Sequence, residues 1–434
     1  MDPQGSPGTN AALSAERLDG LAAIVAAVRS ADGVTKPQLV HRVGLGRSVV
    51  AQRVAELEAA GLVVSAGLGP STGGRAPRRL RLRAEAGLVV GVDCGATSMV
   101  VGVADLLGRV QASAAEPIDV ADGPRTVLAR VEELVDQLLE QVARPAPVWG
   151  IGVGVPGPVE FATGLPVAPP IMPGWDGYPI RDRLSRRYRA PVWVDNDVNL
   201  LALGELRSYP PAAAPDDMLF IKIGTGIGAG LISGGRLHRG ADGCAGDIGH
   251  VAVAEADDVV CRCGNVGCLE AVAGGAALSR DLRRTAEAGE SPLIAEMLAI
   301  SGDLTAADVT VAADRGDPTA RMLLARAGRL VGTTLATLVS FYNPGLVVLG
   351  GGVARAGDHV LAAVRESVYR RSLPLATRTL RIELSRLGEG AGLAGAVHLV
   401  LDALFAPGRL PVWLPFCSPA GRPDVAAALA GLDA

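Results

Sequence analysis

The sequence predicts an α/β protein in which an N-terminal winged helix-turn-helix domain precedes a larger body. Two helical segments joined by a glycine turn, followed by two short strands, predict the N-terminal domain. Farther along the chain, apolar runs of strand length end in glycine-rich turns, and some of these turns open helices. The length of 434 residues, at roughly 150 per domain, leaves room for about three domains.

The first expected element is an amphipathic helix over residues 16–29, because apolar residues recur there at the spacing of one helix face. These residues are Leu21, Ile24, Val25 and Val28. Residues 1–14 show no such periodicity and are expected to form a flexible tail. The folded N-terminal domain is therefore expected to span residues 15–87.

A helix-turn-helix is predicted next. Thr35 and Gln38 have the spacing of a capping box, which starts a short helix that the turn at residues 44–46 ends. A second helix runs from Arg47 to Ala60, and two helices joined by such a turn are typical of DNA-binding proteins. The second helix would enter the major groove. Its expected buried face is Val50, Val54 and Leu57. Its candidate DNA contacts are Arg47, Ser48, Gln52 and Arg53.

The segment after these helices predicts a wing. Residues 62–64 are typical of a strand, and Leu80 and Leu82 alternate with arginines in a partner strand. A glycine-rich tip from Gly67 to Arg75 lies between them. Arginines here would contact phosphates or the minor groove, which favours DNA binding over a winged helix that makes protein contacts only. The candidate wing contacts are Arg75, Arg78 and Arg79.

The distribution of charge agrees with DNA binding. The chain carries a formal net charge of −4, yet residues 1–88 hold 11 Lys and Arg against seven Asp and Glu, and the remainder holds 30 against 38. A basic domain on an acidic body is typical of nucleic-acid binding, although the excess of Arg over Lys also fits GC-rich coding. The chain has no uninterrupted apolar run of membrane-spanning length and no secretory signal, which predicts a cytoplasmic protein without membrane contact.

Three glycine-rich turns in the body could bring backbone N–H groups close to phosphate oxygens. They follow the apolar runs 88–93, 218–223 and 346–349. Their members are Asp93, Gly95 and Thr97; Gly224, Thr225, Gly226 and Gly228; and Gly350, Gly351 and Gly352. Each turn alone is a weak signal, and the second is equally typical of a hairpin. Their occurrence together in one chain favours a nucleotide site.

A fourth turn, Asp195-Asn196-Asp197, leads from a strand into a helix that is expected to end at Arg207. A carboxylate at this point could act as a general base. The alternative is that Asp or Asn caps the helix. The residues themselves leave both interpretations open.

The most specific signal is a set of potential metal ligands, His250, Cys261, Cys263 and Cys268. Three thiolates and one imidazole complete a tetrahedral zinc shell with no open position, which predicts a structural zinc. Such a zinc would hold the loop 246–270, so that Asp247, His250 and Glu270 face a cleft. The alternative is that these cysteines are unliganded core residues.

With these motifs in this order, the chain resembles the ROK family (repressors, open reading frames and sugar kinases) over roughly residues 17–400. Its winged helix makes it similar to the transcriptional regulators of that family. The resemblance implies an actin-like, hexokinase-type ATPase fold, which is ribonuclease H-like, over residues 88–404. Two α/β lobes would enclose a cleft, with sugar at its base and nucleotide between the lobes. Residues 405–434 lie outside the resemblance and are expected to form an irregular extension.

The resemblance also assigns candidate site residues. It places nucleotide contacts on the three glycine-rich turns, with Mg²⁺ bridging the phosphates wherever ATP is used. It gives Asp197 the role of catalytic base in a kinase. Asp247 stands where the family usually has the longer Glu, which leaves the sugar preference open. The sugar contacts it implies are Gly157, Asn196, Asp197, Asp247, His250 and Glu270.

The first hypothesis for function is a sugar-responsive DNA-binding regulator of carbohydrate metabolism, most often a repressor in this family. It would bind a two-fold operator as a homodimer or a higher oligomer. The alternative is an ATP-dependent hexose kinase, either without DNA binding or together with it. The N-terminal domain favours the first hypothesis, because kinases of the family begin near the Asp93 turn. The sugar, the direction of control and the use of ATP stay open.

Overall fold

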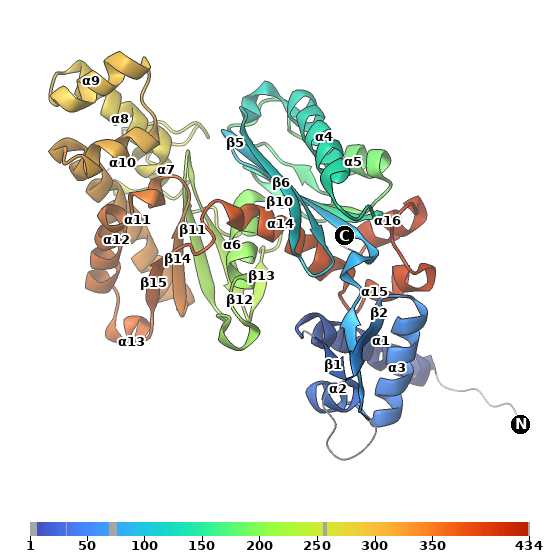
Figure 1. Ribbon diagram of the computed structural model, residues 1–434. Coiled ribbons are helices and arrows are strands. Elements are labelled where there is room, and N and C mark those ends of the chain that lie inside the picture. The colour runs from blue at the N-terminus through green and yellow to red at the C-terminus, as the bar shows by residue number, and fades with distance from the viewer. Residues whose placement is uncertain (1–6, 32, 69–75, 255–257, 433–434) are drawn as a thin grey trace, which may run out of the picture.

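The chain forms an N-terminal head and two α/β lobes, which are distinct regions of the ribbon in Figure 1. The computed structural model describes residues 7–31, 33–68, 76–254 and 258–432. The head contains a three-stranded sheet, and each lobe is built on a five-stranded sheet. We call residues 88–196 lobe 1 and residues 218–384 lobe 2.

The head has the elements of a winged helix-turn-helix. Its helices are α1 (Pro7–Arg29), α2 (Lys36–Val43) and α3 (Arg47–Ala59), and its strands are β1 (Val34–Thr35), β2 (Val63–Leu68) and β3 (Arg78–Leu82), paired in the order β1-β3-β2. The predicted capping box of Thr35 and Gln38 starts α2, and Gly44 ends it in the left-handed conformation with φ 67°. The apolar face of α3 is buried as predicted: Val50, Val54 and Leu57.

Helix α1 is longer than the sequence predicted. It begins at Pro7, so residues 7–14, which were expected in a flexible tail, belong to the helix. The expectation rested on apolar periodicity, which starts only at Leu21. Within residues 7–14, Ala11, Ala12 and Leu13 favour helix by intrinsic propensity, but they do not form an apolar stripe. Residues 1–6 of the expected tail lie outside the described residues.

Lobe 1 combines an antiparallel meander with two parallel strands. Its sheet has the order β10-β7-β4-β5-β6, in which β4, β7 and β10 run parallel. The strands are β4 (Leu88–Cys94), β5 (Ser98–Asp105), β6 (Val110–Pro117), β7 (Val148–Val155) and β10 (Val192–Asn196). Side chains on the two faces of β4 belong to different apolar clusters. Val89 is in one cluster, and Leu88, Val90 and Val92 are in the other, as expected for a sheet buried on both faces.

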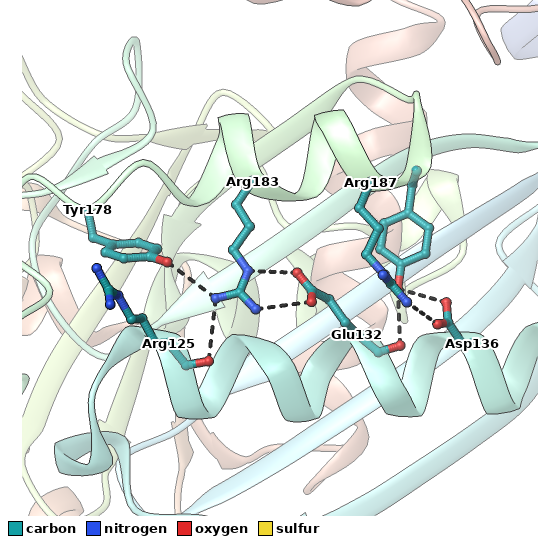
Figure 2. Close-up of polar contacts among 7 residues, drawn as sticks. Arg125, Glu132, Asp136, Tyr178, Arg183 and Arg187 are labelled. Carbon is teal, nitrogen blue, oxygen red and sulfur yellow. Dashed lines mark hydrogen bonds and ion pairs between the residues drawn. The ribbon is translucent and has the colours of Figure 1, made fainter.

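Helices α4 (Pro124–Gln141) and α5 (Ile180–Tyr188) cover one face of this sheet and are held together by ion pairs. Figure 2 shows that Arg183 of α5 donates to both carboxylate oxygens of Glu132 in α4, with Nε–Oε1 and Nη2–Oε2 distances of 2.7 and 3.0 Å. Arg187 pairs with Asp136 one turn further along. These ion pairs join α4 to α5 and so stabilise the helical layer on the outer face of lobe 1.

Lobe 2 has the sheet order β13-β12-β11-β14-β15. Its strands are β11 (Met218–Ile223), β12 (Ile227–Ser233), β13 (Arg236–His238), β14 (Leu346–Gly350) and β15 (Arg381–Leu384). Its helices are α7 (Leu269–Ala273), α8 (Gly275–Glu287), α9 (Pro292–Ser301), α10 (Ala306–Asp314), α11 (Pro318–Tyr342), α12 (Asp358–Arg371) and α13 (Pro374–Thr377). Among the described residues, α11 is the one helix long and apolar enough to cross a membrane, and 61% of its most apolar window is buried within the protein, as in a core helix.

Two helices, α6 (Asp197–Arg207) and α14 (Gly390–Leu404), join the lobes. Helix α6 packs on β11 and β12 of lobe 2, and α14 packs on β4 and β7 of lobe 1. Between them the backbones touch, because a Cβ atom on Gly395 would lie 1.8 Å from the Leu200 carbonyl oxygen and one on Gly204 would lie 2.0 Å from that of Ala391. Glycine is therefore required at both positions for this approach.

The C-terminal residues correct one expectation. Residues 405–434 were expected to be irregular, but they form α15 (Leu410–Trp413) and α16 (Pro423–Ala430), which lie between the head and lobe 1 in Figure 1. Trp413 is fully buried, donates from its indole N–H to the Leu404 carbonyl at 2.8 Å and meets Trp149 edge-on at 5.1 Å. Two prolines of this segment, Pro411 and Pro423, stand in the first turns of α15 and α16, where proline is favoured.

Candidate functional site

A cleft of about 1740 Å³ lies between the two lobes. The three glycine-rich turns and the Asp195-Asn196-Asp197 turn all reach it, because each follows a strand whose end faces the other lobe. The structure therefore brings together every residue predicted for sugar or nucleotide. They are Asp93, Gly95, Thr97, Gly157, Asn196, Asp197, Gly224, Thr225, Gly226, Gly228, Asp247, His250, Glu270, Gly350, Gly351 and Gly352.

The Asn196 side chain orders the base of the cleft. Its Oδ1 accepts from the Val198 N–H at 2.9 Å, so Asn196 is the N-cap of α6, and its Nδ2 donates to the Gly157 carbonyl at 2.9 Å. Asp195, which is 2% exposed, accepts from the Asn196 N–H and from Asn199 Nδ2, both at 2.8 Å. The capping interpretation is thus correct for Asn196, and the same cap places Asp197 in the cleft.

Arg239 was missed by the sequence reasoning and links the two lobes. It follows β13 of lobe 2 and contacts Asp195 Oδ2 of lobe 1 at 2.8 Å from both Nε and Nη2. Its guanidinium lies 3.7 Å from the centre of the Phe161 ring. The carboxylate that organises the Asn196 turn is therefore itself held from the opposite lobe.

Lys222 is a second residue that the sequence reasoning missed. Its Nζ forms an ion pair with Oδ2 of Asp197, the predicted catalytic base, whose side chain is 3% exposed. Burial disfavours the charged form of Lys222, but the charge of Asp197, its hydrogen bond and the charge of Asp93 raise the lysine pKa. Asp197 therefore faces the ammonium group of a half-buried lysine.

Asp93, at the first glycine-rich turn, is enclosed by the start of α14. A Cβ atom on Gly392 would lie 1.8 Å from Asp93 Oδ2. Burial raises the pKa of Asp93 to about 7, the charge of Asp197 adds to this effect, and Lys222 opposes it. The pKa of Asp93 therefore lies near neutral pH.

We expect this raised pKa to make stability depend on pH. The folded protein holds the Asp93 proton more tightly than the unfolded chain does, so the contribution is greatest at low pH and is lost as the pH rises to about 7. Between pH 5 and pH 8 the loss is about 2–3 kcal/mol at most, since part of the carboxyl faces the cleft. Urea unfolding of the wild type and of Asp93→Asn at both pH values measures it. Parallel pH profiles in the two proteins would contradict the expectation.

The second glycine-rich turn joins β11 to β12, so it is a hairpin turn that also lines the cleft. The N-terminal amides of α8 donate to it, from Gly275 to the Gly224 carbonyl at 2.7 Å and from Ala276 to the Thr225 carbonyl at 3.2 Å. Glu270 accepts from the Ile227 N–H at 3.0 Å. The turn is fixed from two sides.

His250 and the three cysteines form a cluster that can hold a metal ion, since their ligand atoms all lie within 4.8 Å of one another. His250 Nδ1 is 3.7 Å from Cys261 Sγ, and Cys263 Sγ is 3.7 Å from Cys268 Sγ. His250 Nε2 lies 3.9 Å from Asp247 Oδ1. One ring nitrogen thus faces the cysteines while the other faces Asp247, so both roles predicted for His250 are compatible.

The candidate DNA contacts in the head do not all lie on one exposed surface. Arg47, Ser48 and Gln52 of α3 are exposed. Arg53 is 12% exposed and pairs with Glu56, so its side chain is turned away from that surface. Arg78 is 64% exposed and lies 3.6 Å from Glu58. Arg79 is half-buried, and Arg75 lies outside the described residues.

Comparisons with known proteins agree with the fold and the cleft. The model of the ROK family matches residues 89–403. The xylose repressor of Caldicellulosiruptor bescii is 28% identical over 374 residues, which are 86% of this chain and 93% of that protein. Residues 88–434 make up 80% of this chain, so an alignment that covers 86% of it includes part of the head.

Two solved structures extend the comparison. A ROK family transcriptional regulator, a homologue of the E. coli MLC protein, has a TM-score of 0.77 at 22% identity and covers 95% of this chain and 100% of its own. A ROK family glucokinase from Streptomyces griseus, in complex with glucose and AMPPNP, has a TM-score of 0.62 at 31% identity and covers 72% of this chain and 99% of its own. The two-lobed actin-like fold is confirmed.

Proposed function

Because the chain belongs to the ROK family, we propose that it is a sugar-responsive DNA-binding transcriptional repressor of carbohydrate metabolism. The similarity to a xylose repressor, which extends into the head, supports this function over that of the shorter glucokinases. A regulator of this kind works on DNA in the cytoplasm, as the sequence predicted. Its operator would be two-fold, with a homodimer or a higher oligomer bound to it.

One observation carries the proposal: the head packs on the far end of a helix that begins in the cleft. Helix α14 starts against Asp93 and ends next to Phe405, and the guanidinium of Arg29 in α1 lies 4.8 Å from the centre of the Phe405 ring. The apolar residues of the head belong to the same continuous cluster as α14 and Trp413. A shift of α14 would therefore move the head.

Helix α6 provides a second connection between the cleft and the far end of α14. It begins at Asp197 in the cleft, and Arg207 at its other end pairs with Asp402 of α14. A sugar that binds the open and closed cleft with different affinities shifts their equilibrium, and a typical coupling is worth about 1–3 kcal/mol. We infer that sugar binding reaches the DNA-binding helices through this helix pair.

The proposed sugar contacts are side chains that can donate to or accept from hydroxyl groups at the base of the cleft. Asn196 is the last residue of lobe 1 and Asp197 the first of α6, while Asp247, His250 and Glu270 come from the loop 246–270 and the start of α7. Gly157 contributes its backbone to the same surface. The three glycine-rich turns are the proposed nucleotide contacts.

The metal ion proposed for the cysteine cluster is a structural zinc. Zinc–sulfur bonds of about 2.3 Å place tetrahedral sulfur ligands roughly 3.8 Å apart. The Cys263 Sγ–Cys268 Sγ and Cys261 Sγ–His250 Nδ1 separations of 3.7 Å support this choice, and all four ligand atoms lie within 4.8 Å of one another. Zinc bound there would fix the loop that carries Asp247, His250 and Glu270 and leave no open position for catalysis.

The proposal is tested with duplexes that the purified protein selects from a random DNA library. D-xylose, D-glucose and N-acetylglucosamine are then titrated while DNA binding is followed by fluorescence anisotropy. We expect one of these sugars to release the wild type, Asp197→Asn to hold DNA without responding, and the exposed variant Glu290→Gln to behave as wild type. Arg47→Ala is expected to lose DNA affinity but to keep sugar binding. A normal sugar response in Asp197→Asn would overturn the pocket assignment.

An ATP-dependent hexose kinase is the second candidate, because Asp197 and three glycine-rich turns share one cleft. In a kinase, Asp197 would accept the proton of the attacking sugar hydroxyl, and Mg²⁺ would neutralise the phosphates. Sugar-dependent ATP turnover that is lost in Asp197→Asn would establish this activity. Sugar binding without ATP turnover would support the regulator and exclude the kinase.

A further inference from the structure

Lys222 stands out by its chemistry and its position. The chain has 41 Lys and Arg residues, of which only Lys36 and Lys222 are lysines. Lys36 is in the head, whereas Lys222 lines the cleft and pairs there with Asp197. An ammonium group is a compact point charge that can turn between acceptors, unlike the broad, planar guanidinium of Arg. A lysine here provides a cation that can change partners.

The strands around Lys222 leave its side chain room to extend. In the sheet of lobe 2 it stands between Gly228 of β12 and Gly350 of β14, neither of which has a side chain. A Cβ atom on Gly224 would lie 3.2 Å from Lys222 Cε. The lysine therefore runs along the second glycine-rich turn and ends at Asp197, on the boundary between the proposed nucleotide and sugar contacts.

The second glycine-rich turn presents successive backbone N–H groups, which an anion-binding site requires. The C=O and N–H of one trans peptide point in opposite directions. Since the Gly224 and Thr225 carbonyls accept bonds from the start of α8, the N–H groups of Thr225 and Gly226 point away from α8. Successive amides of this kind, next to the ammonium group of the half-buried Lys222, form a site suited to a phosphate group.

We propose that Lys222 is a phosphate-binding residue that exchanges its partner Asp197 for a phosphate group when one enters the cleft. The charges of Asp197, Asp93 and Glu270 hold the ammonium while the cleft is without phosphate. A phosphate on the second turn would draw Lys222 away and leave the Asp197 carboxylate free to accept from a sugar hydroxyl. Phosphate and sugar would then strengthen each other's binding, about 10-fold, within the usual range of coupling between sites.

This inference rests on the proposed function in one respect, since it takes sugar to bind at Asp197. The phosphate has two possible sources, the terminal phosphate of a nucleoside triphosphate or the phosphate of a sugar ester. Calorimetric titration of the full chain with D-glucose or D-xylose, alone and with AMPPNP–Mg²⁺, tests the first source. Titration with the corresponding sugar phosphate tests the second.

The expected result is a sugar affinity that rises about 10-fold with AMPPNP–Mg²⁺, or a sugar phosphate that binds about 10-fold more tightly than the free sugar. Lys222→Met should lose this gain, which is the ratio of the variant's own affinities with and without the phosphate group and so does not depend on its affinity for the free sugar. The exposed-site variant Glu290→Gln should keep the gain. An equal gain in Lys222→Met would overturn the proposal.

A second measurement needs no variant. With two lysines in the chain, ¹³Cε-lysine labelling gives two NMR signals, and AMPPNP–Mg²⁺ or the sugar phosphate should shift the signal of Lys222 and not that of Lys36. An unmoved Lys222 signal at saturating concentrations of every phosphate ligand would overturn the proposal. A shifted Lys222 signal in a protein that binds no sugar would support the phosphate role while the proposed function fails.

Discussion

A Cys263→Ser variant is expected to lose its metal ion and to bind sugar about 10-fold or more weakly than the wild type, while it keeps its affinity for DNA. Cys263 is only partly buried, so its replacement removes a ligand and little apolar packing. In the loop 246–270 the described residues make two isolated β-bridges, Ala252 to Cys268 and Val260 to Val266. With so little regular structure, the loop depends on the metal ion to place Asp247 and His250, and displaced metal-site partners typically cost 10–100-fold.

The measurement combines the zinc content per chain with calorimetric titration of the sugar and anisotropy of bound DNA. Cys417→Ser is the matched control, because Cys417 is exposed and lies in the C-terminal segment away from the cluster. It should retain the metal, the sugar affinity and the sugar response. A Cys263→Ser protein with a full complement of zinc and normal sugar affinity would contradict both the metal assignment and its structural role.

The parts of the fold that the sequence predicted are those with local causes. The helix-turn-helix follows from a capping box at Thr35, a left-handed glycine at residue 44 and an apolar stripe on α3, all within 25 residues. Each of these signals depends on neighbouring residues only. The residues of the cleft could be predicted for a similar reason, because the glycine-rich turns and the cysteine spacing are short motifs.

The partners within the cleft could not be predicted in this way. Lys222 and Asp197 are 25 positions apart, and Arg239 and Asp195 are 44 apart, so only the fold brings these charges together. Arg53 is different, since Glu56 is three positions away on the same helix. That spacing predicts a helical ion pair, and it could have removed Arg53 from the candidate DNA contacts.

The C-terminal segment shows a related limit. Trp413 lies in the segment 405–434, which was expected to be irregular, and nothing in its neighbours indicates that Trp149 is its partner. A tryptophan in such a segment nevertheless signals burial, because leaving so large an apolar surface in water is costly. Gly204 and Gly395 could have been interpreted in the same way, because glycine in a helix interior usually marks a close backbone approach.

Replacement of Gly395 by Ala is expected to lower the free energy of unfolding by at least about 3 kcal/mol, at the upper end for overpacked cores. The added methyl carbon would lie 1.8 Å from the Leu200 carbonyl oxygen and 2.8 Å from Leu200 Cα. Because both contacts are backbone atoms of α6, no side chain can turn aside, and the helices must separate. Alanine would otherwise stabilise α14 by about 1 kcal/mol, since it has the higher helix propensity.

Gly390→Ala in the same helix is the matched control, because a Cβ atom there meets nothing within 4 Å. Urea unfolding of both variants measures the difference, and Gly390→Ala should be as stable as the wild type or slightly more stable. If Gly395→Ala still folds, the separated helices should also weaken the sugar response on DNA, since α6 and α14 are the proposed connection between cleft and head. A Gly395→Ala protein with wild-type stability would show that the two helices do not touch through their backbones, and a wild-type sugar response in a destabilised variant would show that the signal takes another route.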